Sequence, residues 1–303
     1  MESLLEKYGY TPDAEEISKS LDVIAANIDN MASDDVLIAC LSMMDLTTLR
    51  TEDTPASVEK LVGKVNSFMK EYSDYPLPAS ICVYPNFAST VRKGLVSSDV
   101  HVTCVAGCFP SSQSYLEIKV RECEMAVENG ADEIDIVLAL NSFMCGDYES
   151  ARAEIRAMRA AVDAAGAKAG RKVVLKVILE TGLLVAPEKI AAASFLAMEE
   201  GADFIKTSTG KVPVNATPVA AYVMCECIRK YYAATGRKVG FKAAGGISNA
   251  KDAVSYYMIA KTILGNEWMN RDLFRFGVSR LANSLISSIE HKNVVFYSRK
   301  TIV

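Results

Sequence analysis

The sequence predicts an α/β fold, a TIM (β/α)8 barrel with an N-terminal helical extension. Short apolar runs alternate with longer segments whose apolar residues recur every three to four positions, as in amphipathic helices. The short runs are continuously apolar, which is typical of parallel strands covered on both faces. Eight strand-then-helix units over about 240 residues are the usual content of such a barrel. A doubly wound open sheet is the alternative, but it needs a glycine-rich turn after the first strand, and MDLTTLRTED contains no glycine.

The elements can be placed in order along the chain. Residues 1–35, which contain EEISKSLDVIAANIDNMA, predict a helical extension, and residues 36–303 are expected to form the catalytic barrel domain. Gly130, Gly201 and Gly236 stand where three of the helices are expected to end. The eight strands are expected at 36–46, 79–85, 99–107, 131–139, 172–180, 202–208, 238–246 and 273–279.

Composition excludes several classes of function. The net charge is −4, with 33 Lys and Arg against 37 Asp and Glu, and no long basic run indicates nucleic-acid binding. His101 and His291 are the only histidines, so a three-histidine zinc site is excluded and no metal is expected. Eight cysteines are too few for a disulfide scaffold, and no apolar run reaches the roughly 18 residues of a membrane span. The acidic N-terminus is unlike a secretory signal, so we expect a cytoplasmic protein.

Charged residues interrupt five of the predicted strands, and all five are expected towards the C-terminal strand ends, where barrels carry their active sites. Charged side chains are rarely buried alone, so these groups must pair or one lysine must be neutral. A neutral lysine amine can attack a carbonyl and form a Schiff base, and a second ammonium nearby would lower its pKa. The five residues are Asp45, Asp135, Lys176, Lys206 and Lys242.

Glycines at the ends of the last three strands predict a phosphate site. Loops after strands seven and eight of these barrels commonly bind phosphate through backbone N–H groups. The pair after the sixth strand adds further amides and a cation. The residues after the sixth, seventh and eighth strands are, respectively, Gly210 and Lys211, Gly245 and Gly246, and Gly277 and Ser279.

The segment DFIKTSTGKVPVNAT (203–217) resembles the Schiff-base segment of the deoxyribose-phosphate aldolases. Further matching blocks occur in the family's order between residues 44 and 279, namely MDLTTL, ICVYP, ADEIDIV, LKVILETG, VGFKAAGGI and FRFGVS. The resemblance implies reversible, metal-independent cleavage of 2-deoxy-D-ribose 5-phosphate to acetaldehyde and D-glyceraldehyde 3-phosphate. No cofactor is implied other than the covalent Schiff base itself, and the expected partners are the sugar phosphate and the aldehydes.

The resemblance also implies a role for each matching residue. Lys206 would carry the Schiff base, Lys242 would lower its pKa, and Asp135 would act as acid and base through water with Lys242. The six phosphate positions named above are carried over as well. The positions expected near the substrate, some in direct contact and some in support, are Asp45, Thr47, Cys82, Lys176, Thr207 and Thr209.

Three positions depart from the family's pattern. Ala243 stands where the family usually has Pro, Ser248 where an Arg is frequent, and Arg280 where a Ser is frequent. Some members end in a mobile tail whose terminal Tyr reaches the active site, but this chain ends in YSRKTIV and we expect no such role. A homodimer is expected, as is common for barrels of this kind. The alternatives are a sugar-phosphate binding protein without turnover and a transaldolase-like Schiff-base transferase.

Overall fold

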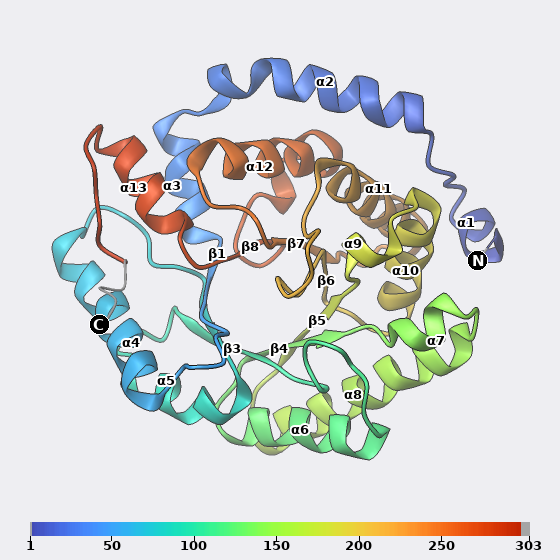
Figure 1. Ribbon diagram of the computed structural model, residues 1–303, viewed down its shortest axis with the longest axis horizontal. Helices are drawn as coiled ribbons and strands as arrows, with labels where there is room; N and C mark the ends of the chain where they lie inside the picture. The colour runs from blue at the N-terminus through green and yellow to red at the C-terminus, as the bar shows by residue number, and fades with distance from the viewer. Residues whose placement is uncertain (1, 298–303) are drawn as a thin grey trace.

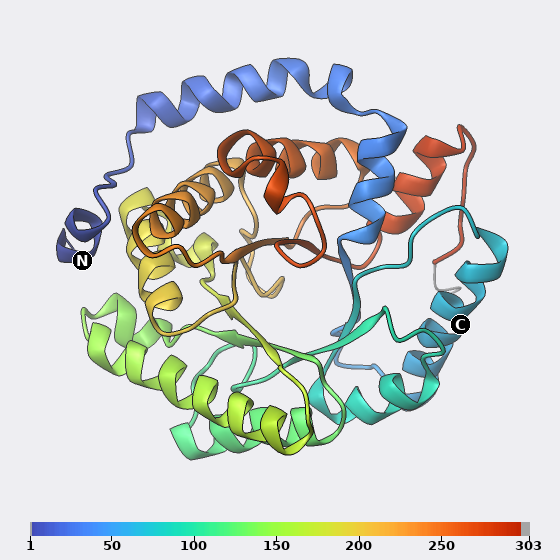
Figure 2. The same cartoon turned by 180° about the vertical axis from the view of Figure 1, so that it is seen from behind.

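Eight parallel strands close into a barrel in which each strand pairs with the next in chain order and β8 pairs with β1 (Figures 1 and 2). The computed structural model describes residues 2–297, so the ending KTIV lies outside the described residues. The predicted TIM barrel is confirmed. The strands are β1 (Met44–Thr47), β2 (Ser80–Val83), β3 (His101–Val105), β4 (Glu133–Val137), β5 (Val174–Ile178), β6 (Phe204–Lys206), β7 (Gly240–Ala244) and β8 (Phe274–Val278).

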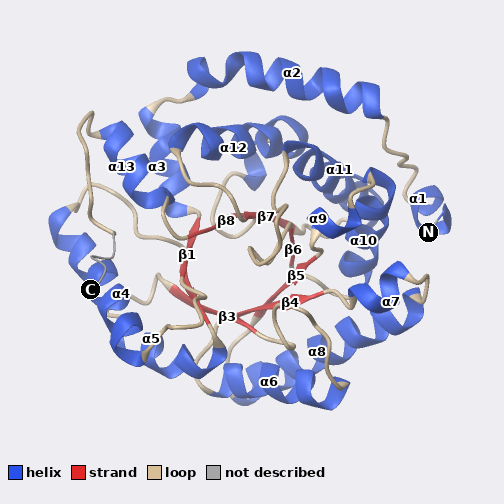
Figure 3. Cartoon of the chain, viewed as in Figure 1, coloured by secondary structure: helices blue, strands red, loops and turns tan. Residues whose placement is uncertain are grey.

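Helices surround the ring of strands on its outer side (Figure 3). Every residue of β2, β4 and β7 is buried, because helices cover the outer face and side chains fill the barrel interior. Within residues 2–297, no helix has both the length and the apolar character needed to cross a membrane. The helices after β1 are α4 (Pro55–Glu71), η1 (Pro85–Phe87), α5 (Ala88–Gly94), α6 (Leu116–Glu128), α7 (Leu140–Met144), α8 (Tyr148–Lys168), α9 (Thr181–Leu184), α10 (Pro187–Glu199), α11 (Pro218–Thr235), α12 (Ala250–Leu264), η2 (Asn266–Trp268) and α13 (Leu281–Ile289).

The N-terminal segment forms α1 (Glu2–Lys7) and α2 (Ala14–Met31), and α2 crosses the outside of α11 and α12 (Figure 1). Asp13 caps α2 by accepting the N–H groups of two residues in its first turn. The residues that α2 buries lie on one face, at Ile17, Ile24 and Ile28. Tyr8 of α1 stacks on Phe195 of α10, with 4.3 Å between the ring centroids. Both helices therefore attach to the outer helices of the barrel.

The prediction of a strand over 36–46 is wrong for its first part. Residues up to Ser42 belong to the helix α3 (Asp34–Ser42), and the strand begins only at Met44. Short apolar runs fit a buried helix and a buried strand equally well, since period alone cannot separate them. The signals that favour a helix here lie just upstream. Ser33 occupies the N-cap position, and two aspartates fill the first turn, where they stabilise the helix dipole.

Candidate active site

The three side chains expected to react lie together inside the barrel. Lys206 ends β6 and is in register with Lys242 on β7, so both side chains point to the same face of the sheet. Each ammonium group donates a 2.8 Å hydrogen bond to the same oxygen, Oδ2 of Asp135 on β4. The two nitrogens are therefore at most about 6 Å apart, close enough to interact strongly in a low-dielectric interior. We call these three residues the mouth cluster.

Four further charged side chains, the inner cluster, continue the network away from Lys206. Arg275 donates to Glu133 at 2.8 Å and to Asp45 at 2.5 Å, and Lys176 pairs with Glu133 at 2.5 Å. Two contacts join the clusters. Lys176 binds Oδ1 of Asp135 at 2.9 Å, and the ammonium of Lys242 binds Asp45. All seven side chains are 3% exposed or less.

Only one of the five predicted charged residues lies at a strand end. Lys206 is the last residue of β6, whereas Asp135, Lys176 and Lys242 occupy the middle of five-residue strands and Asp45 is the second residue of β1. The expectation that all five lie towards the C-terminal ends is therefore wrong for four of them. Barrel interiors are filled by successive layers of side chains, and here these layers are charged rather than apolar.

Sequence reasoning missed Glu133 and Arg275, which hold the inner cluster together. A signal for each was present. Glu133 stands two residues before Asp135 in ADEIDIV, so in a strand both point to the same face. Arg275 is another charged residue within an apolar strand, FRFGV. Arg275 is buried, and so are its two carboxylate partners, Asp45 and Glu133.

The seven buried groups carry one positive charge too many when all are ionised. Three are carboxylates and four are cations. An unbalanced charge in a low-dielectric interior is unfavourable, and loss of one proton from a lysine removes it. Burial lowers the pKa of Lys206, and Lys242 lowers it further, although Asp135 acts in the opposite direction. Among the three lysines of this network, Lys206 is the one whose pKa is lowered, whereas the pKa values of Lys176 and Lys242 are raised.

The other members of the network keep their charges. Burial acts to lower the pKa of Lys242, but the carboxylates of Asp135 and Asp45 outweigh it and raise that pKa. Burial likewise opposes the ionisation of Asp45, but Lys242 and Arg275 hold its pKa at about 2. The pKa values of Glu133 and Asp135 also lie well below the usual range, because adjacent cations overcome the effect of burial. One amine in the barrel mouth is thus singled out from its neighbours.

Comparison with known proteins agrees with this geometry. A family model described as DeoC/LacD family aldolase matches residues 39–283. The chain is 37% identical to the deoxyribose-phosphate aldolase of Homo sapiens, over 84% of this chain and 81% of the relative, and 38% identical to that of Bos taurus over the same shares. The chain belongs to the DeoC/LacD family of aldolases. The resemblance drawn from the sequence motifs is therefore confirmed.

A solved structure supports the same assignment for this aldolase. The deoxyribose phosphate aldolase of Aeropyrum pernix, described as tetrameric, superposes with a TM-score of 0.62 at 26% identity. The match covers 91% of this chain and 98% of that one. The chain therefore shares the barrel architecture of this relative.

The positions expected near the substrate differ in the hydrogen bonds that their side chains already form within the protein. The hydroxyl of Thr207 donates to the carbonyl of Ala244 at 3.1 Å and accepts the N–H of the same residue at 3.0 Å. The hydroxyl of Thr47 donates to the carbonyl of Asp45 at 2.8 Å. Cys82 is buried, and burial raises the pKa of its thiol. Contacts of these residues with the substrate remain predictions.

The positions expected to bind phosphate lie at the end of the barrel where Lys206 stands. Residues 210–211 and 245–246 follow β6 and β7, and Ser279 follows β8. Gly277, however, lies inside β8 rather than after it, so the expectation for its place is wrong. A Cβ atom there would come within 2.8 Å of the Cβ of Ala244, so glycine permits the close contact of β7 with β8.

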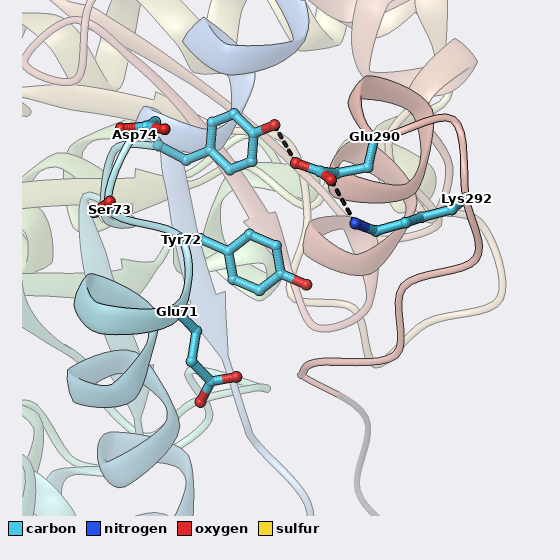
Figure 4. A pocket seen from close by; sticks show the side chains of 7 residues that line it. Glu71, Tyr72, Ser73, Asp74, Glu290 and Lys292 are labelled. Carbon is cyan, nitrogen blue, oxygen red and sulfur yellow. Dashed lines mark hydrogen bonds and ion pairs between the residues drawn. The ribbon is translucent and has the colours of Figure 1, made fainter.

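A pocket of about 420 Å³ on the outer surface does not belong to this site (Figure 4). Its charged groups bind each other, since Glu290 accepts a 2.5 Å hydrogen bond from Tyr75 and pairs with Lys292 at 2.7 Å. Because α4 ends shortly before β2 begins, the pocket lies at the end of the barrel opposite Lys206. The residues that line it are Glu71, Tyr72, Ser73, Asp74, Tyr75, Glu290 and Lys292.

Proposed function

We propose that this aldolase reversibly cleaves 2-deoxy-D-ribose 5-phosphate to acetaldehyde and D-glyceraldehyde 3-phosphate, with Lys206 as the nucleophile. One observation carries the proposal: two lysine ammonium groups share a single oxygen of Asp135 within a buried network that has one cation in excess. This arrangement supplies the uncharged amine that Schiff-base chemistry requires. The human and bovine relatives, named deoxyribose-phosphate aldolases, support the choice of substrate.

The first half of the reaction forms the Schiff base. The lone pair on Nζ of Lys206 attacks the aldehyde carbon C1 of the open-chain sugar, and the resulting carbinolamine loses water to give an iminium ion. Proton transfers are needed at each of these steps. Asp135 faces both lysines and can pass protons between the amine and a water molecule, while Lys242 stays charged beside it.

The second half breaks the bond between C2 and C3. A base, Asp135 acting through water, removes the proton of the C3 hydroxyl, and the C2–C3 electron pair moves towards the iminium to give an enamine. The C3 fragment leaves as D-glyceraldehyde 3-phosphate. Protonation at C2 and hydrolysis of the iminium then release acetaldehyde and regenerate the amine of Lys206.

Borohydride trapping tests this proposal directly. The protein is incubated with acetaldehyde or 2-deoxyribose 5-phosphate, reduced with borohydride, and digested for peptide mass mapping. We expect the added mass on Lys206, and no adduct and no cleavage with Lys206→Ala. Lys119→Ala is a matched control, because Lys119 is an equally buried lysine that pairs with Glu154 between α6 and α8.

The same experiment separates the alternative functions. A sugar-phosphate binding protein without turnover gives no adduct with any carbonyl compound. A transaldolase-like transferase forms its adduct with a ketose phosphate better than with acetaldehyde. Either result would contradict the proposed function.

We further propose that the reaction needs no metal and that the protein is a cytoplasmic homodimer that binds neither nucleic acid nor membrane. Within residues 2–297, no group of three or more His, Cys, Asp and Glu side chains is arranged to hold a metal ion. The eight cysteines, all within the described residues, are free thiols, as is usual for a reducing compartment. EDTA should leave the rate unchanged, and light scattering should give twice the chain mass of 32.9 kDa.

A further inference from the structure

Glu180, which follows β5, accepts hydrogen bonds from the loop that follows Lys206 at the end of β6. Glu180 is 2% exposed, and its carboxylate accepts the N–H of Thr209 at 3.1 Å and the hydroxyl of Thr209 at 2.5 Å. Thr209 stands only three residues after Lys206. Within residues 2–297, no cationic side chain forms an ion pair with Glu180, and both hydrogen bonds to its carboxylate come from Thr209.

The backbone around Glu180 is shaped to make this contact. Glu180 has a left-handed conformation, with φ of 54° and ψ of 57°, which is uncommon for residues with a side chain. Such conformations persist where the surrounding structure holds them, and they cluster at functional sites. A second close contact lies two residues further on, because a Cβ atom at Gly182 would clash with the carbonyl oxygen of Val214. The loops after β5 and β6 are therefore fitted to each other.

The glutamate acts on the next residues through the threonine hydroxyl. While Thr209 donates its hydroxyl proton to Glu180, the same oxygen accepts the N–H of Lys211 at 3.0 Å. The N–H groups on both sides of Gly210 are thus occupied. Gly210 has a φ of 80° and its own N–H has no acceptor within the described residues, so that donor remains available.

The same loop presents a cation that no carboxylate neutralises. The ammonium of Lys211 binds the carbonyl of Leu49 after β1, and no ion pair of Lys211 exists in the described part of the chain. A free amide donor and an ammonium without a carboxylate partner, on adjacent residues, favour an anion. Their spacing depends on the turn that Glu180 and Thr209 fix.

We propose that Glu180 is a positioning residue that sets the affinity for the phosphate end of the substrate by fixing, through Thr209, the turn at Gly210 and Lys211. This inference rests on the proposed function. It separates two tasks along one loop: Lys206 at its start performs the chemistry, and the turn held by Glu180 binds the phosphate. Thr209 is then part of this clamp, since both its donor and its acceptor are used within the protein.

The test compares substrates with and without phosphate. Glu180→Ala should raise the KM for 2-deoxyribose 5-phosphate and the inhibition constant of inorganic phosphate about tenfold, with kcat within about twofold of wild type. The kcat/KM for 2-deoxyribose and the trapping of acetaldehyde on Lys206 should not change. Glu180→Gln keeps one acceptor for Thr209 and should restore part of the affinity. A general loss of structure would instead lower kcat for both sugars and the trapping of acetaldehyde on Lys206.

Thr209→Val provides a second route to the same answer. It removes the hydroxyl that links Glu180 to Lys211, so it should reproduce the effect of Glu180→Ala, and the double variant should be no worse than either single variant. Glu290→Gln is the matched control, because Glu290 also accepts a 2.5 Å hydrogen bond from a hydroxyl, that of Tyr75, but at the opposite end of the barrel (Figure 4). It should leave both substrates unaffected.

Two results would overturn the proposal, and they are distinguishable. If wild type prefers the phosphorylated sugar but Glu180→Ala and Thr209→Val weaken both substrates equally or neither, Glu180 is not a phosphate-positioning residue. If wild type itself shows no preference for the phosphorylated sugar and no inhibition by inorganic phosphate, the phosphate site fails together with the role of Glu180. A selective rise in KM in both variants supports the proposal.

Discussion

The mouth and inner clusters of the barrel both consist of buried charged side chains, yet their charges balance differently. The inner cluster pairs two cations, Lys176 and Arg275, with two carboxylates, Asp45 and Glu133. The mouth cluster sets two lysines against one carboxylate, Asp135. Burial alone therefore does not make a lysine reactive. In the proposed mechanism the excess cation does so, and the lysine that loses its proton is the one at the strand end.

The balanced cluster contributes to the reactive one through shared contacts. Asp45 lies between them, since it binds Arg275 on one side and Lys242 on the other. It helps to keep Lys242 charged, which in turn disfavours a charge on Lys206. The comparison predicts that substitutions in the mouth cluster change reactivity, whereas substitutions in the inner cluster change stability first.

The largest expected effect is on the rate, from Asp135→Asn. The substitution removes the acid and base of the proposed mechanism, so kcat for cleavage should fall about 10²- to 10⁴-fold. It also removes a negative charge beside Lys206, which leaves the amine neutral to lower pH. Because Asp135 also transfers protons during Schiff-base formation, trapping of acetaldehyde on Lys206 by borohydride should be slower, but with long incubation it should still occur, at a pH below that needed by wild type.

A carboxylate near the start of the same strand serves as the control for this prediction. Asp132 immediately precedes β4 and accepts the N–H of Val102 at 2.9 Å, outside both clusters. Asp132→Asn should leave kcat and trapping close to wild type. Loss of trapping in Asp135→Asn, with the fold intact by circular dichroism, would contradict the view that an excess cation makes Lys206 reactive.

Arg275→Met should produce the largest loss of stability. It leaves Glu133 and Asp45 buried without their shared cation, and breaking a buried ion pair in this way costs about 3–5 kcal/mol. Arg121→Met is matched to it, because Arg121 also pairs with two carboxylates, Glu124 and Glu128, but is 54% exposed. Exposed pairs contribute little to stability, because solvent screens their attraction. Equal urea midpoints for the two variants would show that the inner cluster is not a balanced, stabilising unit.

The fold could be predicted from sequence because strand runs and helical periodicity alternate clearly along most of the chain. The exception was the first strand, where the apolar run of α3 gave no period that separates helix from strand. Its burial against α12 and α13 depends on contacts more than 200 residues away, which local patterns do not reveal.

The reacting groups could be recognised because charged residues in apolar strands are conspicuous. Arg275 interrupts an apolar strand in the same way, whereas Glu133 stands at the start of its strand, where charges are usually structural. Glu180 could not have been found in this way. Its role depends on a left-handed backbone and on contact with Thr209, a residue 29 positions further along the chain.

Lys242→Leu removes a buried cation from the network, whereas Asp135→Asn removes a buried carboxylate, so the two substitutions should shift the pKa of Lys206 in opposite directions. Without this cation the remaining three carboxylates match three cations, so Lys206 no longer gains by losing its proton. Its pKa should rise, and the pH profile of kcat/KM should move to higher pH by one or two units, about 1.4 kcal/mol for each unit. Lys119→Leu, which removes a buried lysine outside the barrel, should leave the profile in place. An unchanged profile in Lys242→Leu would contradict the two-lysine account.

The smallest expected effect is a pH-dependent loss of stability in His101→Gln, because His101 lies between Glu133 of the inner cluster and solvent. Nδ1 of His101 lies 2.7 Å from Oε1 of Glu133, and this hydrogen bond raises the pKa of His101 above its ordinary value despite partial burial. Because the folded-state pKa of His101 is higher than its unfolded value of about 6.5, protonated His101 stabilises the protein fully below pH 6.5, and this contribution is lost as pH rises through the folded value.

His101→Gln should therefore lower the urea midpoint at pH 5 and match wild type at pH 9. Its side chain is 39% exposed, so screening keeps the difference below about 1 kcal/mol. Since the histidine contacts the balanced cluster and not the mouth, the pH profile of cleavage should follow wild type, and a shift in that profile would show that the two clusters titrate as one.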